Sequence, residues 1–219
     1  MTDRRVPRLL LVTDRSAAGA RALTDVVAAA LRGIAGSGVR PGDVAVQLRE
    51  KDLSGQALAE LARAVRVTTA AAGVALHIND RADVALAVDA DGVQLTGTSL
   101  TPPDVARIAP GLAIGVSAHA AAEVAALRAS AGGDRVAFAV LGPINDTPAK
   151  RRYGPPLGTD VLAEAARVGL PLIAIGGIAP DDVRGVLAAG AYGVACIRAV
   201  MAASDPAAAV NAFCSLLKV

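Results

Sequence analysis

Short apolar segments rich in β-branched residues alternate with longer alanine-rich segments along the whole chain. The short segments predict eight strands, at 9–13, 44–48, 74–78, 92–95, 113–117, 136–140, 172–175 and 193–197. The segments between them predict helices, at 19–34, 54–71, 81–87, from 102, at 120–131 and 159–168, from 180, and at 205–217. Successive strand–helix units indicate an α/β fold with parallel strands, and their number matches a (β/α)8 TIM barrel.

The length of the chain and the regular succession of units indicate one domain over residues 1–219. No shift in composition and no linker marks a second domain. A doubly wound open sheet is the alternative, and it would favour a Gly-x-Gly-x-x-Gly turn after the first strand. The sequence at that place, Asp14-Arg15-Ser16-Ala17-Ala18-Gly19, is not such a turn.

Composition narrows the class of protein. Hydrophobic residues make up 53% of the chain and charged residues 19%, which indicates a large core and argues against disorder. A net charge of +2 argues against binding nucleic acid or a membrane surface. No apolar run reaches the roughly 18 residues of a membrane span, and no signal-peptide core is present, so we expect a cytoplasmic protein. Cys196 and Cys214 match no metal-binding or redox spacing and are expected to be buried thiols.

The end of the second predicted strand carries the strongest candidate for a binding site. Gln47, Arg49 and Lys51 occupy alternate positions, so an extended chain places all three side chains on one face. A guanidinium and an ammonium on the same face form a cradle for phosphate oxygens. The alternative is a strand that runs into a solvated polar loop.

Polar groups recur at the ends of the later strands, and in a barrel these ends meet at one face, where active sites lie. The groups are Asn79 and Asp80; Thr96, Thr98 and Ser99; Ser117 and His119; Asn145, Asp146, Thr147 and Lys150; Gly176 and Gly177; and Ile197 and Arg198. We therefore expect one site built from the ends of several strands.

Several of these residues admit a chemical role and an ordinary structural one. Gly176-Gly177 would let backbone N–H groups approach a phosphate, or would form a simple tight turn. Asp80 suits Mg²⁺ or the N-cap of the next helix. Arg198, Lys150 and His119 could contact anions or move a proton, or could be solvated residues at loop and helix starts. Two anion sites, one carboxylate for a cation and few proton-transfer groups favour phosphate-ester chemistry.

Taken in order, the motifs resemble those of the thiamine phosphate synthase family, which also contains the thiazole tautomerases. The motifs are Gln47-Leu48-Arg49-Glu50-Lys51, Ile78-Asn79-Asp80-Arg81, Ala90-Asp91-Gly92-Val93-Gln94-Leu95, Gly115-Val116-Ser117-Ala118-His119, Gly142-Pro143-Ile144 with Thr147 and Lys150, and Ala174-Ile175-Gly176-Gly177-Ile178. The resemblance covers nearly the whole chain.

The resemblance implies a Mg²⁺-dependent transferase of thiamine biosynthesis that joins a pyrimidine methyl diphosphate to a thiazole phosphate. In this family the diphosphate leaves first, and the thiazole nitrogen then captures the pyrimidine methylene cation. The resemblance implies that the pyrimidine diphosphate is bound by Gln47, Leu48, Arg49, Glu50, Lys51 and Asn79, and that Asp80 binds the metal. It implies action on the diphosphate or the reacting groups for Arg49, Lys51, Ser117 and Lys150. It implies binding of the thiazole phosphate for Thr147, Gly177, Ile197 and Arg198. The expected partners are these two small molecules, and a homodimer stays open.

The chain departs from the family pattern at three positions. Ser99 stands where the second Mg²⁺ ligand of the family is an aspartate, Ala149 replaces a threonine, and Arg198 replaces a serine. Two alternatives therefore stay open: a thiazole tautomerase that moves a proton with His119, and a non-catalytic binder of thiamine phosphate. Retention of Lys51 argues against the tautomerase, which has no diphosphate to bind.

Overall fold

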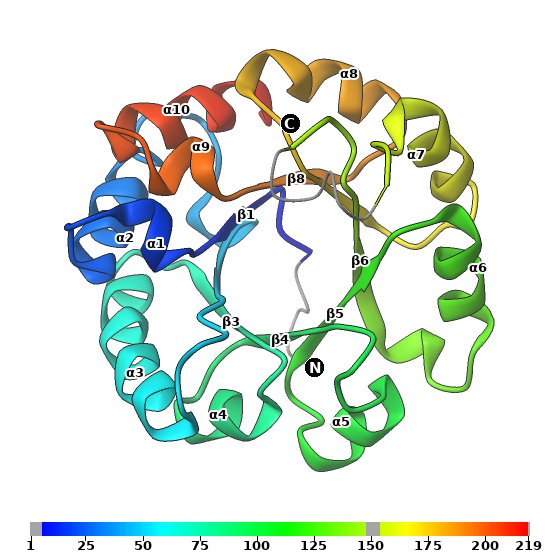
Figure 1. Cartoon of the computed structure of the whole chain (residues 1–219), viewed down its shortest axis with the longest axis horizontal. Helices are drawn as coiled ribbons and strands as arrows, with labels where there is room; N and C mark the ends of the chain where they lie inside the picture. The colour runs from blue at the N-terminus through cyan, green and yellow to red at the C-terminus, as the bar shows by residue number, and fades with distance from the viewer. Residues whose placement is uncertain (1–5, 148–153, 219) are drawn as a thin grey trace.

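The computed structural model describes residues 6–147 and 154–218, and its strands form a closed barrel. Figure 1 shows the strands as an inner ring and the helices as an outer ring. Each strand pairs in parallel with the next in the chain, and β8 pairs with β1, which closes the sheet. This confirms the predicted (β/α)8 fold, since a doubly wound sheet has open edges.

The strands lie within one residue of their predicted bounds, because short β-branched runs flanked by glycine or proline mark buried parallel strands. They are β1 Leu9–Val12, β2 Val44–Leu48, β3 Ala75–Asn79, β4 Gly92–Leu95, β5 Ala113–Ala118, β6 Val136–Leu141, β7 Leu172–Ile175 and β8 Gly193–Cys196. The helices are α1 Arg15–Ala18, α2 Leu23–Arg32, α3 Gly55–Ala71, α4 Ala82–Ala87, α5 Pro102–Ile108, α6 Ala121–Ala129, α7 Gly158–Ala166, α8 Val183–Ala188, α9 Arg198–Met201 and α10 Pro206–Leu216.

The loops after β1 and β8 differ from the sequence-based prediction. Instead of one helix over 19–34, a short helix α1 begins directly after Asp14, whose carboxylate accepts from the N–H groups of Ser16 and Ala17. Gly19, at φ +66°, ends this turn, and α2 then starts at Leu23. The four-residue helix α9 was not predicted, because a single turn is too short to show a helical period.

The inside of the barrel has two different halves. Outward-facing strand residues pack against the helices. Inward-facing residues, all but one from β1, β6, β7 and β8, form a smaller apolar cluster of Leu10, Val12, Ala45, Phe138, Val140, Ile173 and Ala195. By strand alternation, several inward positions of β2 to β5 carry polar side chains instead, namely Gln47, His77, Asn79, Gln94 and Ser117. The polar half of the interior therefore leads up to the strand ends that carry the predicted site.

Candidate functional site

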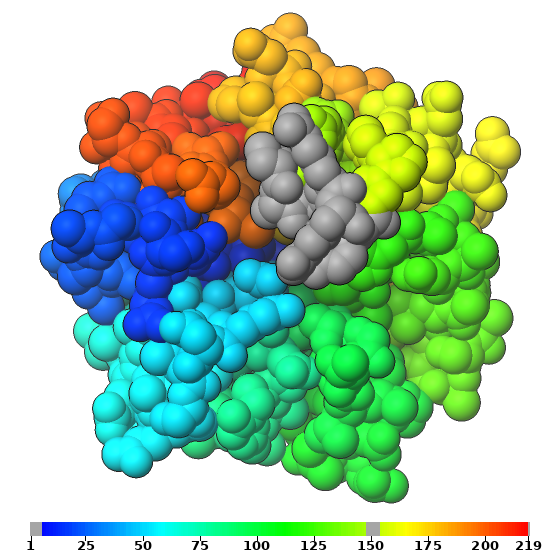
Figure 2. Space-filling view, viewed as in Figure 1, coloured from blue at the N-terminus to red at the C-terminus, as the bar shows by residue number. Residues whose placement is uncertain are grey.

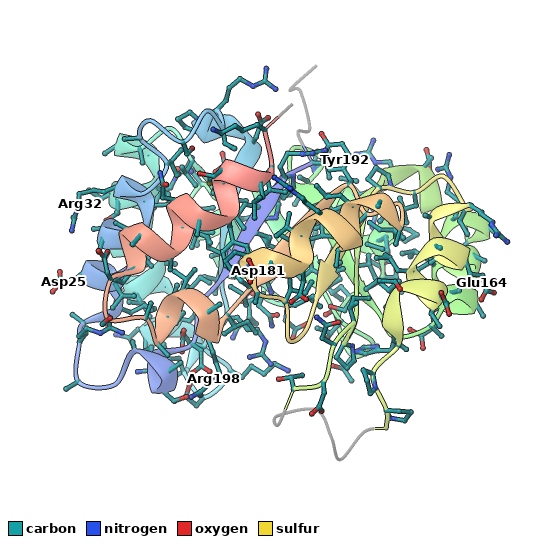
Figure 3. All side chains as sticks on the ribbon, turned by 90° about the horizontal axis from the view of Figure 1, so that it is seen from above. Asp25, Arg32, Glu164, Asp181, Tyr192 and Arg198 are labelled. Carbon is teal, nitrogen blue, oxygen red and sulfur yellow. The ribbon has the colours of Figure 1, made fainter. Side chains whose placement is uncertain are left out.

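The loops that follow the strands gather at one end of the barrel. Figure 2 shows this end, with the loop after β1 in blue next to the loop after β2 in cyan. Figure 3 gives the side view and shows Tyr192, just before β8, and Arg198, just after it, at opposite ends of the molecule. The predicted residues at strand ends therefore share one face, as a barrel requires.

Two cationic side chains extend from the end of β2. Arg49 is partly exposed, and its guanidinium forms no ion pair with a residue in the described ranges. Lys51 is exposed. Gln47 lies deeper, where its Nε2 donates to Asn79 Oδ1 at 3.0 Å. The structure therefore places four of the six residues expected to hold a diphosphate at the ends of β2 and β3, where the Arg49 guanidinium has no ion-pair partner among the described residues.

A hydrogen-bonded support fixes the end of β2 to the end of β1. Thr13 is fully buried, and its Oγ1 donates to Glu50 Oε1 at 2.7 Å and accepts from the Arg49 N–H at 2.9 Å. The other oxygen, Glu50 Oε2, accepts from the backbone N–H and from Nε of Arg15, both at 3.2 Å. Because Thr13 holds the Arg49 backbone, the direction of the cationic side chains depends on β1.

Two predicted ligand contacts face away from the barrel mouth. The side chain of Leu48 is fully buried in the core between strands and helices. The side chain of Glu50 is also buried, and both its oxygens are occupied by Thr13 and Arg15. Alternation along β2 explains both orientations, since these residues lie between Gln47, Arg49 and Lys51 on the opposite face.

A cleft of about 310 Å³ opens at the rim between the loops after β1 and β2. It is lined by Asp14, Arg15, Ser16, Arg49, Glu50, Lys51 and Asp52. The hydrogen bond from Arg15 lowers the pKa of the Asp52 carboxyl and raises that of the Arg15 guanidinium. The hydrogen bond from Ser16 lowers the pKa of Asp14, with a smaller contribution from the charge of Arg198. These shifts favour the charged forms of Asp14, Arg15 and Asp52.

Asp80 and Ser99 meet directly, as expected for the two metal-ligand positions. Ser99 Oγ donates a hydrogen bond to Asp80 Oδ1 and accepts from the Thr96 N–H at 2.7 Å. Asp80 has a left-handed backbone, φ +67°, and its side chain does not cap α4, which has Arg81 at its N-cap. The alternative role of Asp80 as an N-cap is therefore excluded.

Asp80 and Ser99 supply too few ligands for Mg²⁺ by themselves, so their fit to this ion depends on oxygens from a bound phosphate. Mg²⁺ takes one or two protein carboxylates and completes its shell with water and substrate phosphates. Asp80 supplies one carboxylate, and the described residues contain no group of three or more His, Cys, Asp or Glu that could hold a metal unaided. The donor set therefore fits Mg²⁺ only together with phosphate oxygens.

Two predicted residues after β5 take different directions. Ser117 is partly buried, and its Oγ accepts from Gln94 Nε2 at 3.1 Å. The side chain of His119 is 57% exposed and lies beside α6, with Nδ1 3.7 Å from Glu123 Oε2. The His119 N–H also donates to this oxygen, at 2.8 Å. Ser117 therefore belongs to the barrel interior, whereas His119 belongs to the outer rim.

The loop after β6 packs tightly on the end of β7. Asn145 donates from its N–H to the Gly176 carbonyl at 2.9 Å and from Nδ2 to the Gly177 carbonyl at 3.3 Å. A Cβ on Gly177, at φ +64°, would lie 2.5 Å from the Asp146 carbonyl oxygen. Close packing thus explains these glycines, and their role in phosphate binding stays a prediction. Thr147 is partly buried at the end of this segment, and Lys150 lies outside the described residues.

The end of β8 delivers the last two predicted residues. Ile197 is partly buried against the inner apolar cluster, and Arg198 is exposed as the first residue of α9. The side chain of Ile197 thus forms part of the wall of the barrel mouth. Arg198 thus lies at the rim, and its contact with an anion stays a prediction.

Sequence reasoning missed two supporting residues, Thr13 and Gln94. Both are buried polar groups whose importance lies in contacts to other strands. A polar residue inside an apolar strand was the signal available in each case, because such a residue needs a hydrogen-bond partner.

A second, larger cavity lies elsewhere. It has a volume of about 840 Å³ and opens at the other end of the barrel, and none of the predicted site residues lines it.

No helix among the described residues combines the length and apolarity needed to cross a membrane.

Comparison with known proteins agrees with the motifs. The family model described as thiamine monophosphate synthase matches residues 9–200. A thiamine-phosphate synthase of Roseiflexus castenholzii is 45% identical over 94% of this chain and 86% of that protein, and a putative thiamine-phosphate synthase of Geobacter sulfurreducens is 46% identical over 95% and 93%. A solved structure of thiamine phosphate pyrophosphorylase from Pyrococcus furiosus superposes with a TM-score of 0.82 at 30% identity, covering 98% of this chain and 96% of that one. The chain therefore belongs to the thiamine monophosphate synthase family.

Proposed function

We propose that the protein is a transferase that joins hydroxymethylpyrimidine diphosphate to thiazole phosphate, giving thiamine phosphate and diphosphate. Membership of the family supports this reaction, as do relatives named for it. The observation that carries the proposal is the Arg49 guanidinium, which forms no ion pair within the described residues and lies with Lys51 after β2, while Asn79 and Asp80 lie at the end of the neighbouring strand β3. A leaving diphosphate needs this combination of cations and hydrogen-bond donors.

In the proposed reaction the bond between the pyrimidine methylene carbon and the diphosphate oxygen breaks, and its electron pair leaves with the diphosphate. The thiazole nitrogen then forms the new bond to the methylene carbon. Neither step requires a proton transfer, so positioning and charge stabilisation suffice. Arg49 and Lys51 would stabilise the developing charge, while Asn79 and Ser117 would donate hydrogen bonds to the phosphate oxygens.

Mg²⁺ would neutralise part of the diphosphate charge as the bond breaks. Asp80 would hold it with one carboxylate, and Ser99 would position that carboxylate through its hydrogen bond. The thiazole phosphate would lie across the mouth, held by Thr147, Gly177 and the chain at Ile197, with the Arg198 guanidinium at the rim.

The proposal also includes the cellular compartment and the oligomeric state of the protein. The two cysteines are buried and unpaired, as expected of a protein in the reducing cytoplasm. Each strand end contributes to the site from one chain, so the proposed reaction does not require a homodimer.

The test is formation of thiamine phosphate from the two substrates, with and without Mg²⁺. We expect Mg²⁺-dependent product, and a loss of about 100-fold in kcat/KM for Arg49→Ala. Arg63→Ala, at an exposed position on α3, is the matched control and should retain the wild-type rate.

Three other results would overturn the proposal. Folded protein that makes no product would remove the synthase. Isomerisation of thiazole carboxylate phosphate that His119→Ala abolishes would point to the tautomerase. Tight thiamine phosphate binding without turnover would point to the non-catalytic binder.

A further inference from the structure

We infer that Gln94 is a positioning residue, which orients the Ser117 hydroxyl as a hydrogen-bond donor toward the diphosphate. The inference rests on the proposed function for its substrate. Gln94 itself is not among the residues expected to contact the diphosphate. Its hydrogen bond to Ser117, from β4 to β5, repeats the hydrogen bond from Gln47 on β2 to Asn79 on β3.

Two glutamines inside the barrel form the same diagonal contact. Gln47 is paired across the sheet with His77, and its Nε2 donates to Asn79, two residues further along β3. Gln94 is paired with Gly115, and its Nε2 donates to Ser117, two residues further along β5. The donor–acceptor distances are 3.0 and 3.1 Å. Each glutamine thus holds the next polar side chain toward the barrel mouth.

Burial separates the glutamines from the ligand. Gln47 is 4% exposed and Gln94 is 2% exposed, whereas Ser117 is open to the mouth in part. Within the described part of the chain, Gln94 Oε1 has no hydrogen-bond partner. An unsatisfied buried amide oxygen lowers stability, and an apolar residue of similar size would avoid that cost. The donor end of the amide is therefore the part of Gln94 that has a use.

Gly115 leaves the space in which the Gln94 amide lies. A Cβ on Gly115 would lie 2.3 Å from Gln94 Oε1 and 2.6 Å from Phe138 Cζ. A glycine is thus required for Gln94 to lie flat against β5, below Ser117. The Phe138 ring also lies against Gly115, so both side chains occupy the space that a Cβ at this position would need.

The direction of the two hydrogen bonds determines whether Ser117 and Asn79 have donors or acceptors left for a ligand at the strand ends. Because Gln94 donates to Ser117 Oγ, the hydroxyl proton is free to be donated to another acceptor. Because Gln47 donates to Asn79 Oδ1, the remaining donors of Asn79 lie on Nδ2. Both side chains therefore present donors, which phosphate oxygens require.

The experiment compares Gln94→Met, which removes the donor without adding charge, with Gln94→Glu, which replaces it by an acceptor. Isothermal titration with inorganic diphosphate and Mg²⁺ reports binding, and initial rates report KM for each substrate. For Gln94→Met we expect diphosphate affinity to fall about tenfold, with KM for thiazole phosphate unchanged. Gln94→Glu should lose more, because its carboxylate would accept the Ser117 proton. Gln56→Met, at an exposed glutamine on α3, is the matched control.

A double-mutant cycle with Ser117→Ala decides whether Gln94 acts through Ser117. We expect Gln94→Met to weaken diphosphate binding less than about twofold further once Ser117 is alanine. Additive effects, or wild-type diphosphate affinity in Gln94→Met and Gln94→Glu, would overturn the inference. If the wild-type protein binds diphosphate but forms no thiamine phosphate, the proposed function fails while the titrations still test Gln94.

Discussion

Ser99 Oγ donates a hydrogen bond to Asp80 Oδ1, so the residue that stands in place of a second acidic ligand is tied to the remaining carboxylate. The hydroxyl orients Asp80 but adds no charge. In the proposed function, metal binding at this place would therefore depend on the anionic ligand to a greater extent than in a site with two carboxylates.

Ser99→Asp should restore the second charge. We expect the Mg²⁺ concentration for half-maximal product formation to fall about tenfold, because a second carboxylate strengthens Mg²⁺ binding. Mn²⁺ binding in the presence of inorganic diphosphate, measured by electron paramagnetic resonance, checks this without catalysis. Asp80→Asn is the counterpart and should abolish the Mn²⁺ signal change. Unchanged metal binding in both variants would contradict the assignment of this site.

Arg15 bridges two carboxylates of very different burial, Glu50 and Asp52, whose side chains are 5% and 74% exposed. Glu50→Ala should lower the free energy of unfolding by about 2–3 kcal/mol, since it leaves the Thr13 hydroxyl and the Arg15 N–H without acceptors. Asp52→Ala removes an exposed partner, whose ion pair is screened by solvent, and should lower it by far less than Glu50→Ala does. Urea denaturation gives both values, and equal losses would contradict the role of Glu50 as a support.

A Cβ on Gly115 would meet side chains packed inside the barrel, whereas a Cβ on Gly111 would lie in open space. A Cβ at 115 would come within 3 Å of Gln94 and Phe138, and a Cβ at 111 would meet nothing within 4 Å. Gly115→Ala should therefore lower the free energy of unfolding by about 2 kcal/mol or more, and Gly111→Ala by less than about 0.5 kcal/mol. Thermal and urea unfolding of the two variants test the packing of the polar half directly.

His77 is buried on the polar side of the barrel, with its ring centroid 5.8 Å from that of Phe138. Burial lowers its pKa from 6.5 to about 4, against a smaller opposing effect of the charge on Asp91. Between these values the unfolded chain binds the proton more readily than the folded chain, so stability rises with pH and is lost as pH falls. We expect the protein to lose about 2 kcal/mol between pH 7 and pH 5 through this group.

Replacement of His77 tests that dependence. His77→Asn should remove most of the slope of unfolding free energy against pH in this range, whatever it does to stability at pH 7. A slope that persists in His77→Asn would assign the pH dependence to other groups.

The sequence by itself determined the barrel and the end of the barrel that carries the site. Buried parallel strands are continuous apolar runs, and such runs with helices between them are visible without coordinates. Alternation with a period of two also predicted a shared face for Gln47, Arg49 and Lys51, although β2 itself ends at Leu48. Motifs at several strand ends then determined the family.

Only the tertiary structure decided what each polar residue touches. Glu50 appeared within a ligand-binding motif, yet its carboxylate supports Thr13 and Arg15 on the neighbouring loop. Gln94 appeared as a polar residue in an apolar strand, and only the register of β4 with β5 placed its amide under Ser117. The physical reason is that strand pattern is a local property of the chain, whereas a hydrogen bond across the barrel depends on the register and packing of strands far apart in sequence.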